Sequence, residues 1–320
     1  MSESKAMQGK VLLASPRGFC AGVVRAVDIV NLALELYGLP LYVRREIVHN
    51  KYVVNELRKK GTIFIDDLDE VPPGSRVIFS AHGVAPEIRT AAVQRQLKVI
   101  DATCPLVTKV HMEAIRYARK GYTILLIGHE DHDEVIGTLG EAPHAIRVLI
   151  TPDQVEKLEV PDPSRVAYLT QTTLSLDDTR QIIERLREKY PLIHAPSSED
   201  ICYATQNRQA AVLELAKAAE IILVVGSANS SNSRRLVEVA KGQDVPAYLI
   251  DDIESIQTDW LASVRVVGLT AGASAPEGLV ERVIHYLREI GYPEVETIGH
   301  IREDVEFALP AELVRMVPAR

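Results

Sequence analysis

The chain has 320 residues, which is enough for two or three small domains. Hydrophobic residues make up 47% and charged residues 25%, the balance of a folded globular protein rather than of a disordered one. The formal net charge is −8, and such a surface repels the phosphates of nucleic acids and of anionic membranes. Aromatic residues are only 5%, too few for stacking on single-stranded nucleic acid. We therefore expect no nucleic-acid partner and no membrane attachment.

The sequence also lacks the signals of an exported protein. No apolar run approaches the roughly 20 residues of a membrane-spanning helix. Residues 1–10 are polar and lack the apolar core of a signal peptide, which predicts a cytoplasmic protein. The three cysteines are an odd number and do not suit a disulfide framework. In a reducing compartment we expect them to be free thiols or metal ligands.

Short apolar runs alternate with amphipathic helical patterns along the chain. The runs rich in β-branched residues predict strands at residues 11–14, 43–48, 77–80, 123–127, 166–170, 221–225 and 264–269. They show no in/out alternation, as is typical of strands buried on both faces of a parallel sheet. Helices are predicted at residues 84–96, 105–119, 176–189, 203–218 and 277–289. This alternation predicts an α/β fold with mainly parallel sheets.

The cysteines mark a plan that is repeated three times. Cys20, Cys104 and Cys202 each open a helical stretch, and their spacings of 84 and 98 residues match the size of a small α/β domain. After each cysteine come two strands that end in polar, turn-forming residues. We expect three pseudo-repeated α/β domains at residues 10–101, 102–198 and 199–290, with residues 291–320 as a C-terminal tail packing back on the core.

Ligands of parallel α/β sheets bind beyond the carboxyl ends of the strands. Three such domains facing one another would bring the cysteines and six polar loops to one central cavity. The candidate residues of these loops, from first domain to third, are His49 and His82; His132, Glu134 and Thr172; and Ser230, Ser231, Asn232 and Ser274.

A single cysteine is more often an inert buried residue than a ligand. Three cysteines at the same place in three successive units favour ligation instead. Each stands at a helix N-terminus, where the helix dipole stabilises a thiolate. The absence of a Cys-x-x-Cys pair argues against a zinc ribbon or a ferredoxin-type run. The pattern predicts a 4Fe–4S cluster lodged between domains, with three protein ligands and one open iron.

The polar loops have both structural and functional interpretations. In residues 227–233 one serine is expected to cap a helix at residues 234–240, while the remaining donors suit an anion at a helix N-terminus. Ser274 is interpreted in the same way. The three histidines can donate hydrogen bonds to phosphate or pass protons. Most glutamates are solvated surface charges, but Glu134 follows a strand end and is a candidate proton donor.

These segments resemble, in order, the motifs of the 4-hydroxy-3-methylbut-2-enyl diphosphate reductase (LytB/IspH) family. The cysteine motifs are PRGFCAGV at residues 16–23, DATCPLV at 101–107 and ICYATQNRQ at 201–209. The other motifs are EIVHN at 46–50, SAHGV at 80–84, GHEDHDE at 128–134, TQTTLS at 170–175, NSSNS at 229–233 and TAGASAPE at 270–277. The resemblance runs from about residue 11 to residue 287. One departure is that Asp131 and Asp133 flank His132, where the family more usually has glycine and proline.

The resemblance implies three α/β domains in a trefoil around a 4Fe–4S cluster held by the three cysteines. It implies a two-electron reductive dehydroxylation of an allylic diphosphate to isopentenyl and dimethylallyl diphosphates, with electrons from a ferredoxin- or flavodoxin-type donor. Glu134 would be the proton donor, supported by Thr172 and His132. The diphosphate-binding residues would be His49, His82, His132, Thr172, Ser230, Ser231, Asn232 and Ser274.

Two other functions are compatible with a cluster. A hydro-lyase would remove water with no net electron flow, and would need a base for a carbon-bound proton, for which Glu134 is the only carboxylate among the motif residues. A cluster-binding electron carrier or sensor would not need the polar loops. A requirement for reductant excludes the first, and tight diphosphate binding excludes the second.

Overall fold

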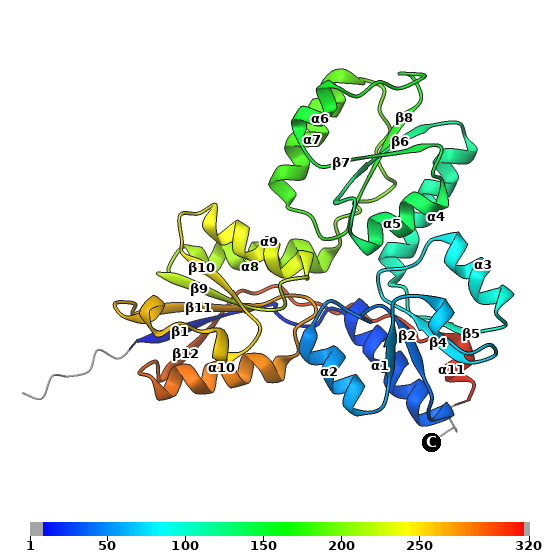
Figure 1. Ribbon diagram of the computed structural model, residues 1–320. Coiled ribbons are helices and arrows are strands. Elements are labelled where there is room, and N and C mark those ends of the chain that lie inside the picture. Colours follow the sequence, from blue (N-terminus) through cyan, green and yellow to red (C-terminus); the bar gives the residue numbers. More distant parts are fainter. Residues whose placement is uncertain (1–8, 317–320) are drawn as a thin grey trace, which may run out of the picture. The chain divides into compact units, whose positions relative to one another are not determined.

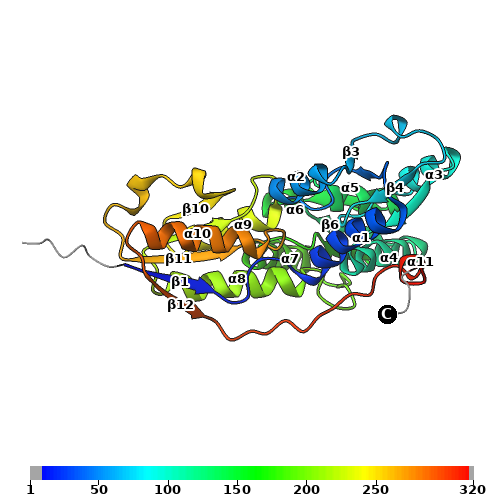
Figure 2. The same cartoon turned by 90° about the horizontal axis from the view of Figure 1, so that it is seen from below.

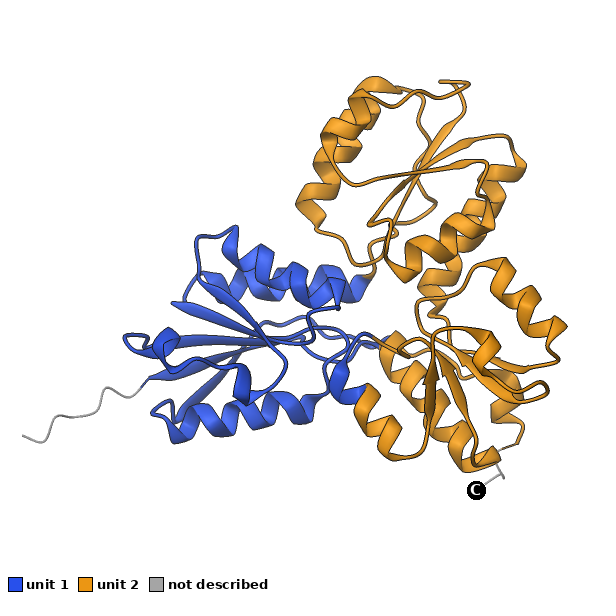
Figure 3. Ribbon diagram, viewed as in Figure 1, with its two compact units in different colours: residues 1–20, 49–53, 203–305 blue, residues 21–48, 54–202, 306–320 orange. Residues whose placement is uncertain are grey.

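The computed structural model describes residues 9–316, which form two compact units (Figure 3). The described parts of the first unit are residues 9–20, 49–53 and 203–305. The second unit comprises residues 21–48, 54–202 and 306–316. Among these residues no helix is both long enough and apolar enough to cross a membrane.

The first unit is built on a five-stranded parallel sheet with the order β10-β9-β11-β1-β12. Its strands are β1 (Lys10–Ala14), β9 (Ile221–Val225), β10 (Ala247–Ile250), β11 (Val266–Ala271) and β12 (Glu294–Ile298). Its helices are α8 (Tyr203–Ala216), α9 (Ser231–Lys241) and α10 (Glu277–Glu289), with short 3-10 helices η2 (Ile253–Ser255) and η3 (Thr258–Leu261). Helix α10 packs on one face of the sheet, and α8 and α9 pack on the other (Figure 1 and Figure 2).

Strand β1 belongs to this sheet, whereas the sequence placed it in a domain spanning residues 10–101. Leu12 pairs with Gly268 of β11 on one side and with Glu296 of β12 on the other. Leu13 packs on the α10 side and Leu12 on the opposite side, and both are buried. A run that is apolar on both faces predicts a central strand, but it does not say which sheet the strand joins.

The expected C-terminal tail, residues 291–320, is divided between the two units. Its residues 294–298 form the edge strand β12 of the first unit. Its residues 306–316 belong to the second unit, where α11 (Ala311–Val314) lies beside α1. Leu313 is fully buried there, and Arg25 Nε donates a 2.8 Å hydrogen bond to the Ala308 carbonyl.

The second unit contains two parallel sheets, so three parallel sheets in all confirm the predicted α/β class. The order of one is β3-β2-β4-β5, with β2 (Tyr42–Arg44), β3 (Ile63–Ile65), β4 (Arg76–Phe79) and β5 (Lys98–Asp101). The order of the other is β7-β6-β8, with β6 (Thr123–Ile127), β7 (Ile146–Leu149) and β8 (Val166–Thr170). The helices are α1 (Ala21–Tyr37), α3 (Pro86–Gln94), α4 (Pro105–Arg119), α5 (Asp133–Glu141), α6 (Pro152–Glu156), α7 (Leu176–Lys189) and the 3-10 helix η1 (Leu68–Glu70). Helix α2 (Lys51–Lys59) begins in the first unit and ends in the second.

The β7-β6-β8 sheet is covered on both faces. Helices α4 and α5 pack on one face through residues such as Val110 and Val135. Helices α6 and α7 cover the other face through residues such as Val155 and Ile182. This double cover explains why β6 and β8 are apolar on both faces apart from a threonine at one end of each.

Strand β2 is shorter than predicted. It ends at Arg44, because Arg45 adopts a left-handed backbone conformation with φ of 56°. His49 therefore lies in the irregular segment between β2 and α2 and does not directly follow the strand.

His111 is buried between α4 and α5. Its Nδ1 lies 3.0 Å from Glu141 Oε1. Its ring packs against Gly137, where an added Cβ would lie 3.1 Å from His111 Cε1. Burial lowers the pKa of His111, and the opposing effect of the Glu141 carboxylate does not overcome it. The folded protein thus favours the neutral imidazole.

We predict that acidification from pH 7.5 to 5.5 lowers the free energy of unfolding more in the wild type than in His111→Gln. The unfolded chain takes up a proton on this residue near pH 6.5, whereas the folded chain does so only at lower pH. This part of the stability is present above pH 6.5 and is lost as the pH falls below it. Urea unfolding at several pH values should give slopes differing by at most about 1.4 kcal/mol per pH unit. Equal slopes would contradict the prediction.

Candidate functional site

The three cysteines all lie at the start of a helix. Cys104 is the N-cap of α4, and Pro105 follows it at the first helical position. Cys20 directly precedes α1, and Cys202 directly precedes α8. All three are partly exposed. Their thiolates can therefore be stabilised by a helix N-terminus while remaining accessible to a ligand.

Each cysteine is also fixed by a backbone hydrogen bond of the same kind. Its N–H donates to the carbonyl of a loop residue two positions beyond the last residue of a parallel strand. The bonds run from Cys20 N to Ala273 O (3.2 Å), from Cys104 N to Ala81 O (2.9 Å) and from Cys202 N to Thr172 O (3.1 Å). The strands before these loops are β11, β4 and β8. Each cysteine is thus attached to the polar loop of the repeat that precedes it in cyclic order.

Glu134 lies in the first turn of α5 and is buried. Its carboxylate accepts two kinds of hydrogen bond from Thr172. The Thr172 N–H donates to Oε2 at 3.0 Å, and the Thr172 hydroxyl lies 2.8 Å from Oε1. Since the Thr172 carbonyl accepts from Cys202 N–H, the second unit brings together Cys202, Thr172 and Glu134.

Two of the predicted site histidines, His82 and His132, lie near one another in the second unit. The ring centroids of His82 and His132 are 6.0 Å apart, edge to face. His132 caps α5, because its Nδ1 accepts a 3.2 Å hydrogen bond from Glu134 N–H. His82 Nδ1 lies 3.3 Å from Ser80 Oγ and 4.0 Å from Asp133 Oδ2. His82, His132, Glu134 and Thr172 therefore form one polar group.

Asp133, noted in the sequence only as a departure from the family pattern, is part of this group. It forms an ion pair with Arg45, which directly follows β2. The departure thus places a carboxylate next to His82 and links the segment after β2 to the start of α5. The sequence gave no sign of this, because the two segments are 88 residues apart.

In the first unit the predicted residues gather around the N-terminus of α9. Asn232 Oδ1 accepts a 2.9 Å hydrogen bond from Ala273 N–H, and Ser274 Oγ donates a 2.9 Å hydrogen bond to the His49 carbonyl. Ser227 Oγ accepts from Lys51 N–H at 3.0 Å. These bonds join the segment around His49, the start of α9 and the loop after β11.

Helix α9 begins at Ser231, three residues before the predicted start. Ser230 is its N-cap, with Oγ accepting from Ser233 N–H, which confirms the expected capping serine. Ser231 and Asn232 consequently lie in the first turn and are buried. Gly226 and Gly272 both pack against Ser233, and an added Cβ would come within 2.2 Å and 2.0 Å of its Oγ. The two glycines allow the loops after β9 and β11 to approach the helix start.

Sequence reasoning missed a buried ion pair in the second unit. Lys109 Nζ of α4 donates a 2.8 Å hydrogen bond to Asp200 Oδ1, and the Asp200 side chain is fully buried. Burial raises the pKa of Asp200 to about 6, even though Lys109 and the Thr170 N–H act to lower it. The carboxylate is therefore mainly ionised at neutral pH. The only sequence signal was the position of Asp200, two residues before Cys202.

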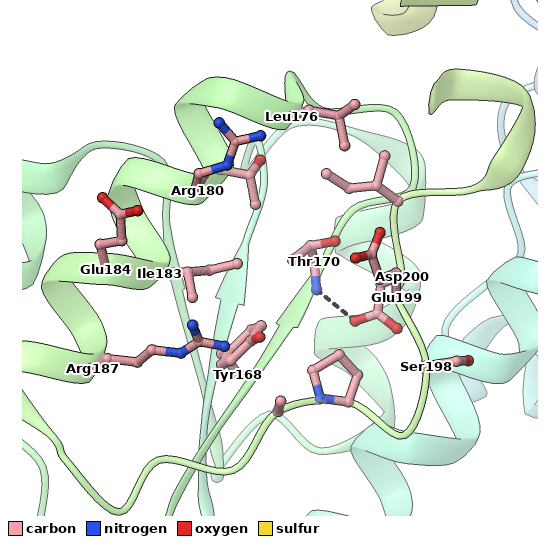
Figure 4. Close-up of a pocket in the computed structure, with 14 residues that line it drawn as sticks. Tyr168, Thr170, Leu176, Arg180, Ile183, Glu184, Arg187, Ser198, Glu199 and Asp200 are labelled. Atoms are coloured by element: carbon pink, nitrogen blue, oxygen red, sulfur yellow. Dashed lines mark hydrogen bonds between the residues drawn. The ribbon is translucent and has the colours of Figure 1, made fainter. Parts of the chain in front are cut away.

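Asp200 borders a pocket of about 560 Å³ that no predicted site residue lines (Figure 4). The pocket lies between α7 and the segment 195–201, above the end of β8. Tyr168 and Thr170 of β8 form part of its lining, and Arg180 and Arg187 extend from α7 at its rim.

A family model described as LytB protein matches residues 11–288. The chain belongs to the LytB protein family. It is 58% identical over 312 residues to a 4-hydroxy-3-methylbut-2-enyl diphosphate reductase of Acidothermus cellulolyticus, covering 97% of this chain and 92% of the relative. It is 54% identical to the protein of that name from Leifsonia xyli, covering 96% and 91%.

Solved structures agree with this family assignment. The E-1-hydroxy-2-methyl-but-2-enyl-4-diphosphate reductase from Plasmodium falciparum superposes with a TM-score of 0.94 and is 39% identical, covering 97% of this chain and 98% of that one. A structure described as (E)-4-hydroxy-3-methyl-but-2-enyl diphosphate reductase, the terminal enzyme of the non-mevalonate pathway, gives a TM-score of 0.63 at 32% identity, covering 88% and 99%.

The contacts of Asn232 generate a prediction on stability. Asn232→Ala leaves the Ala273 N–H without its acceptor and should lower the free energy of unfolding by about 1–2 kcal/mol. Asn232→Asp should retain the wild-type stability, because its carboxylate still accepts this bond and lies in the first turn of α9, where the helix dipole favours it. Denaturant unfolding followed by circular dichroism compares the three proteins. Equal stability of the alanine and wild-type proteins would contradict the structural role.

Proposed function

We propose that the chain is an oxidoreductase that reduces 4-hydroxy-3-methylbut-2-enyl diphosphate to isopentenyl and dimethylallyl diphosphates, the last step of the methylerythritol phosphate pathway. The reaction consumes two electrons and two protons and releases water. Identity of 54–58% to reductases over nearly the whole chain supports the reaction. The structural observation that carries the proposal is the repeated placement of the three cysteines, each at a helix start and each bonded to a polar loop.

The donor set suits an iron–sulfur cofactor. Thiolates are the ligands that iron–sulfur clusters require, and each cysteine here is partly exposed at a helix N-terminus. We assign Cys20, Cys104 and Cys202 as ligands of a 4Fe–4S cluster with one open iron. When bound, such a cluster supplies electrons and a Lewis-acidic iron. A ferredoxin- or flavodoxin-type protein is the proposed electron donor.

We assign the diphosphate to polar residues of the family motifs. In the first unit the N-terminus of α9 and its hydroxyl and amide side chains offer neutral donors to an anion. The proposed donors are His49, His82, His132, Thr172, Ser230, Ser231, Asn232 and Ser274. The use of neutral donors and a helix terminus suits a protein whose net charge is −8, since the ligand's charge must be met locally.

Glu134 is the proposed proton donor. A hydroxyl leaves readily only as water, so a proton must reach its oxygen as the C–O bond breaks. Glu134 is buried and hydrogen-bonded to the Thr172 hydroxyl, which can pass a proton between the carboxyl group and the substrate. His132, whose Nδ1 accepts from Glu134 N–H, holds the first turn of α5 in place and supports this relay.

The function is tested by anaerobic turnover after reconstitution with iron and sulfide. We expect both isomeric diphosphates to form only when a chemical reductant is supplied. Cys20→Ser, Cys104→Ser and Cys202→Ser should each lose iron and activity, because each removes one ligand. Conversion without reductant would favour a hydro-lyase, and a reducible cluster with no diphosphate binding would favour an electron carrier. Full iron content and activity in any serine variant would refute the three-ligand assignment.

Glu134→Gln tests the proton donor. The amide retains an acceptor for the Thr172 N–H but cannot deliver a proton, so we predict normal iron content and substrate affinity with turnover reduced by about 10²–10⁴-fold. Glu130→Gln, which alters an exposed carboxylate in the same loop, is the matched control and should keep its turnover. Near-normal turnover of Glu134→Gln removes this residue from the chemistry, and loss of iron would make its role structural.

A further inference from the structure

The residues just before each cysteine are held by a basic side chain from another cysteine-bearing helix. The first case is Cys104. Arg25 lies on α1, five residues after Cys20, and its Nη1 donates to the carbonyls of Ala102 and Thr103 at 3.2 Å and 3.1 Å. These are the two carbonyls immediately before Cys104.

The second case is Cys20. Arg208 lies on α8, six residues after Cys202, and its side chain is fully buried. Its Nη2 donates to the Gly18 carbonyl at 2.7 Å and to the Phe19 carbonyl at 3.3 Å, and its Nε also donates to Gly18 at 3.0 Å. The two carbonyls immediately before Cys20 are again the acceptors.

The third case, Cys202, follows the same plan with one change. Lys109 lies on α4, five residues after Cys104, and its Nζ donates to the carbonyls of Ser198 and Glu199 and to Asp200 Oδ1. Before the other two cysteines a backbone N–H continues the strand pairing, from Gly18 to Ala271 O and from Ala102 to Phe79 O, both at 3.1 Å. At the corresponding place before Cys202, the Asp200 carboxylate accepts from Thr170 N–H at 2.9 Å (Figure 4).

At this place Lys109 therefore pairs with a side chain of the segment itself as well as with its carbonyls. The pocket of about 560 Å³ lies between the segment 195–201 and α7, and none of the residues lining that pocket belongs to α4 (Figure 4). Lys109 and Asp200 connect the segment to α4 and to β8 at the same time. Glu113, one turn further along α4, adds a 3.0 Å hydrogen bond from Ser197 N–H.

We propose that Arg25, Lys109 and Arg208 are positioning residues for the three cysteine ligands, each fixing the segment that leads into one cysteine. The order is cyclic, since the helix after Cys20 holds Cys104, the helix after Cys104 holds Cys202, and the helix after Cys202 holds Cys20. The inference rests on the proposed function in so far as the cysteines bind a cluster. The three residues touch no substrate and act only through the cysteines.

Arg25→Met and Lys109→Met test the inference with a matched control. Both remove the donors but keep an unbranched side chain that favours the helix. Arg119→Met makes the same change in charge on α4, at an exposed residue in the last turn of the helix. Arg208 is left intact in this test, because removing a fully buried arginine from its Glu303 partner can prevent folding.

In reconstituted protein we expect the two variants to release iron to a chelator about 10-fold faster than the wild type or the control. We also expect an altered electron paramagnetic resonance signature of the reduced cluster, which a loss of stability alone does not produce. Arg25→Lys and Lys109→Arg retain the charge and a donor and should restore most of the wild-type behaviour. Wild-type release rates and signatures in both methionine variants would overturn the inference.

A second measurement uses the metal-free protein. Alkylation followed residue by residue by mass spectrometry should change its rate at Cys104 in Arg25→Met and at Cys202 in Lys109→Met, and at neither in Arg119→Met. Uniform rates across the variants would overturn the inference without any reference to the cluster. If the wild type itself takes up no cluster, the proposed function fails, whereas the alkylation pattern still decides whether the cations position the cysteines.

Discussion

The hydrogen bond from each cysteine N–H to the loop beyond a parallel strand is the constraint on which the candidate site depends. A cysteine has one side-chain torsion before its sulfur, so fixing the backbone leaves the sulfur only a few staggered positions. The bond to Ala273, Ala81 or Thr172 fixes that backbone, and the helix that begins at the next residue fixes it from the other side. The same loops carry predicted site residues, because Thr172 is itself an acceptor and Ser274 directly follows the acceptor Ala273. Ligand and loop are therefore positioned together.

Sequence patterns predicted the elements well, but not all of their partners. Helix α4 and strands β6, β8 and β9 have the predicted bounds, since apolar runs and a proline after Cys104 define them locally. Strand β1 was assigned to a domain of residues 10–101 but pairs with β11 and β12, because its apolar pattern carries no information about partners more than 250 residues away. The polar residues at strand ends were identified, whereas Asp133, Lys109 and Asp200 were missed. Their roles arise from pairing across long stretches of chain, which neither spacing nor composition records.

The positions of Arg25, Lys109 and Arg208 do carry a sequence signal of pairing between distant segments. Arg25 and Lys109 each follow a cysteine by five residues, and Arg208 follows one by six, so each lies in the second turn of its helix. In isolation a basic residue there is an ordinary solvated charge. The repeated plan becomes visible only when the acceptors are known, because each side chain reaches carbonyls of a different repeat.

The charges of these cations are balanced nearby, which indicates that orientation rather than net charge is their main contribution. Arg208 pairs with Glu303 at 2.9 Å, Lys109 pairs with Asp200 at 2.8 Å, and Asp101 acts electrostatically on Arg25. A buried ion pair adds little net stability, since desolvation offsets most of the attraction, but it is strongly directional and holds its partners in one arrangement. The backbone carbonyls that complete the coordination of each cation are the groups whose position determines the following cysteine. A compensated, hydrogen-bonded cation therefore fixes a ligand without adding an unbalanced charge to the buried interior.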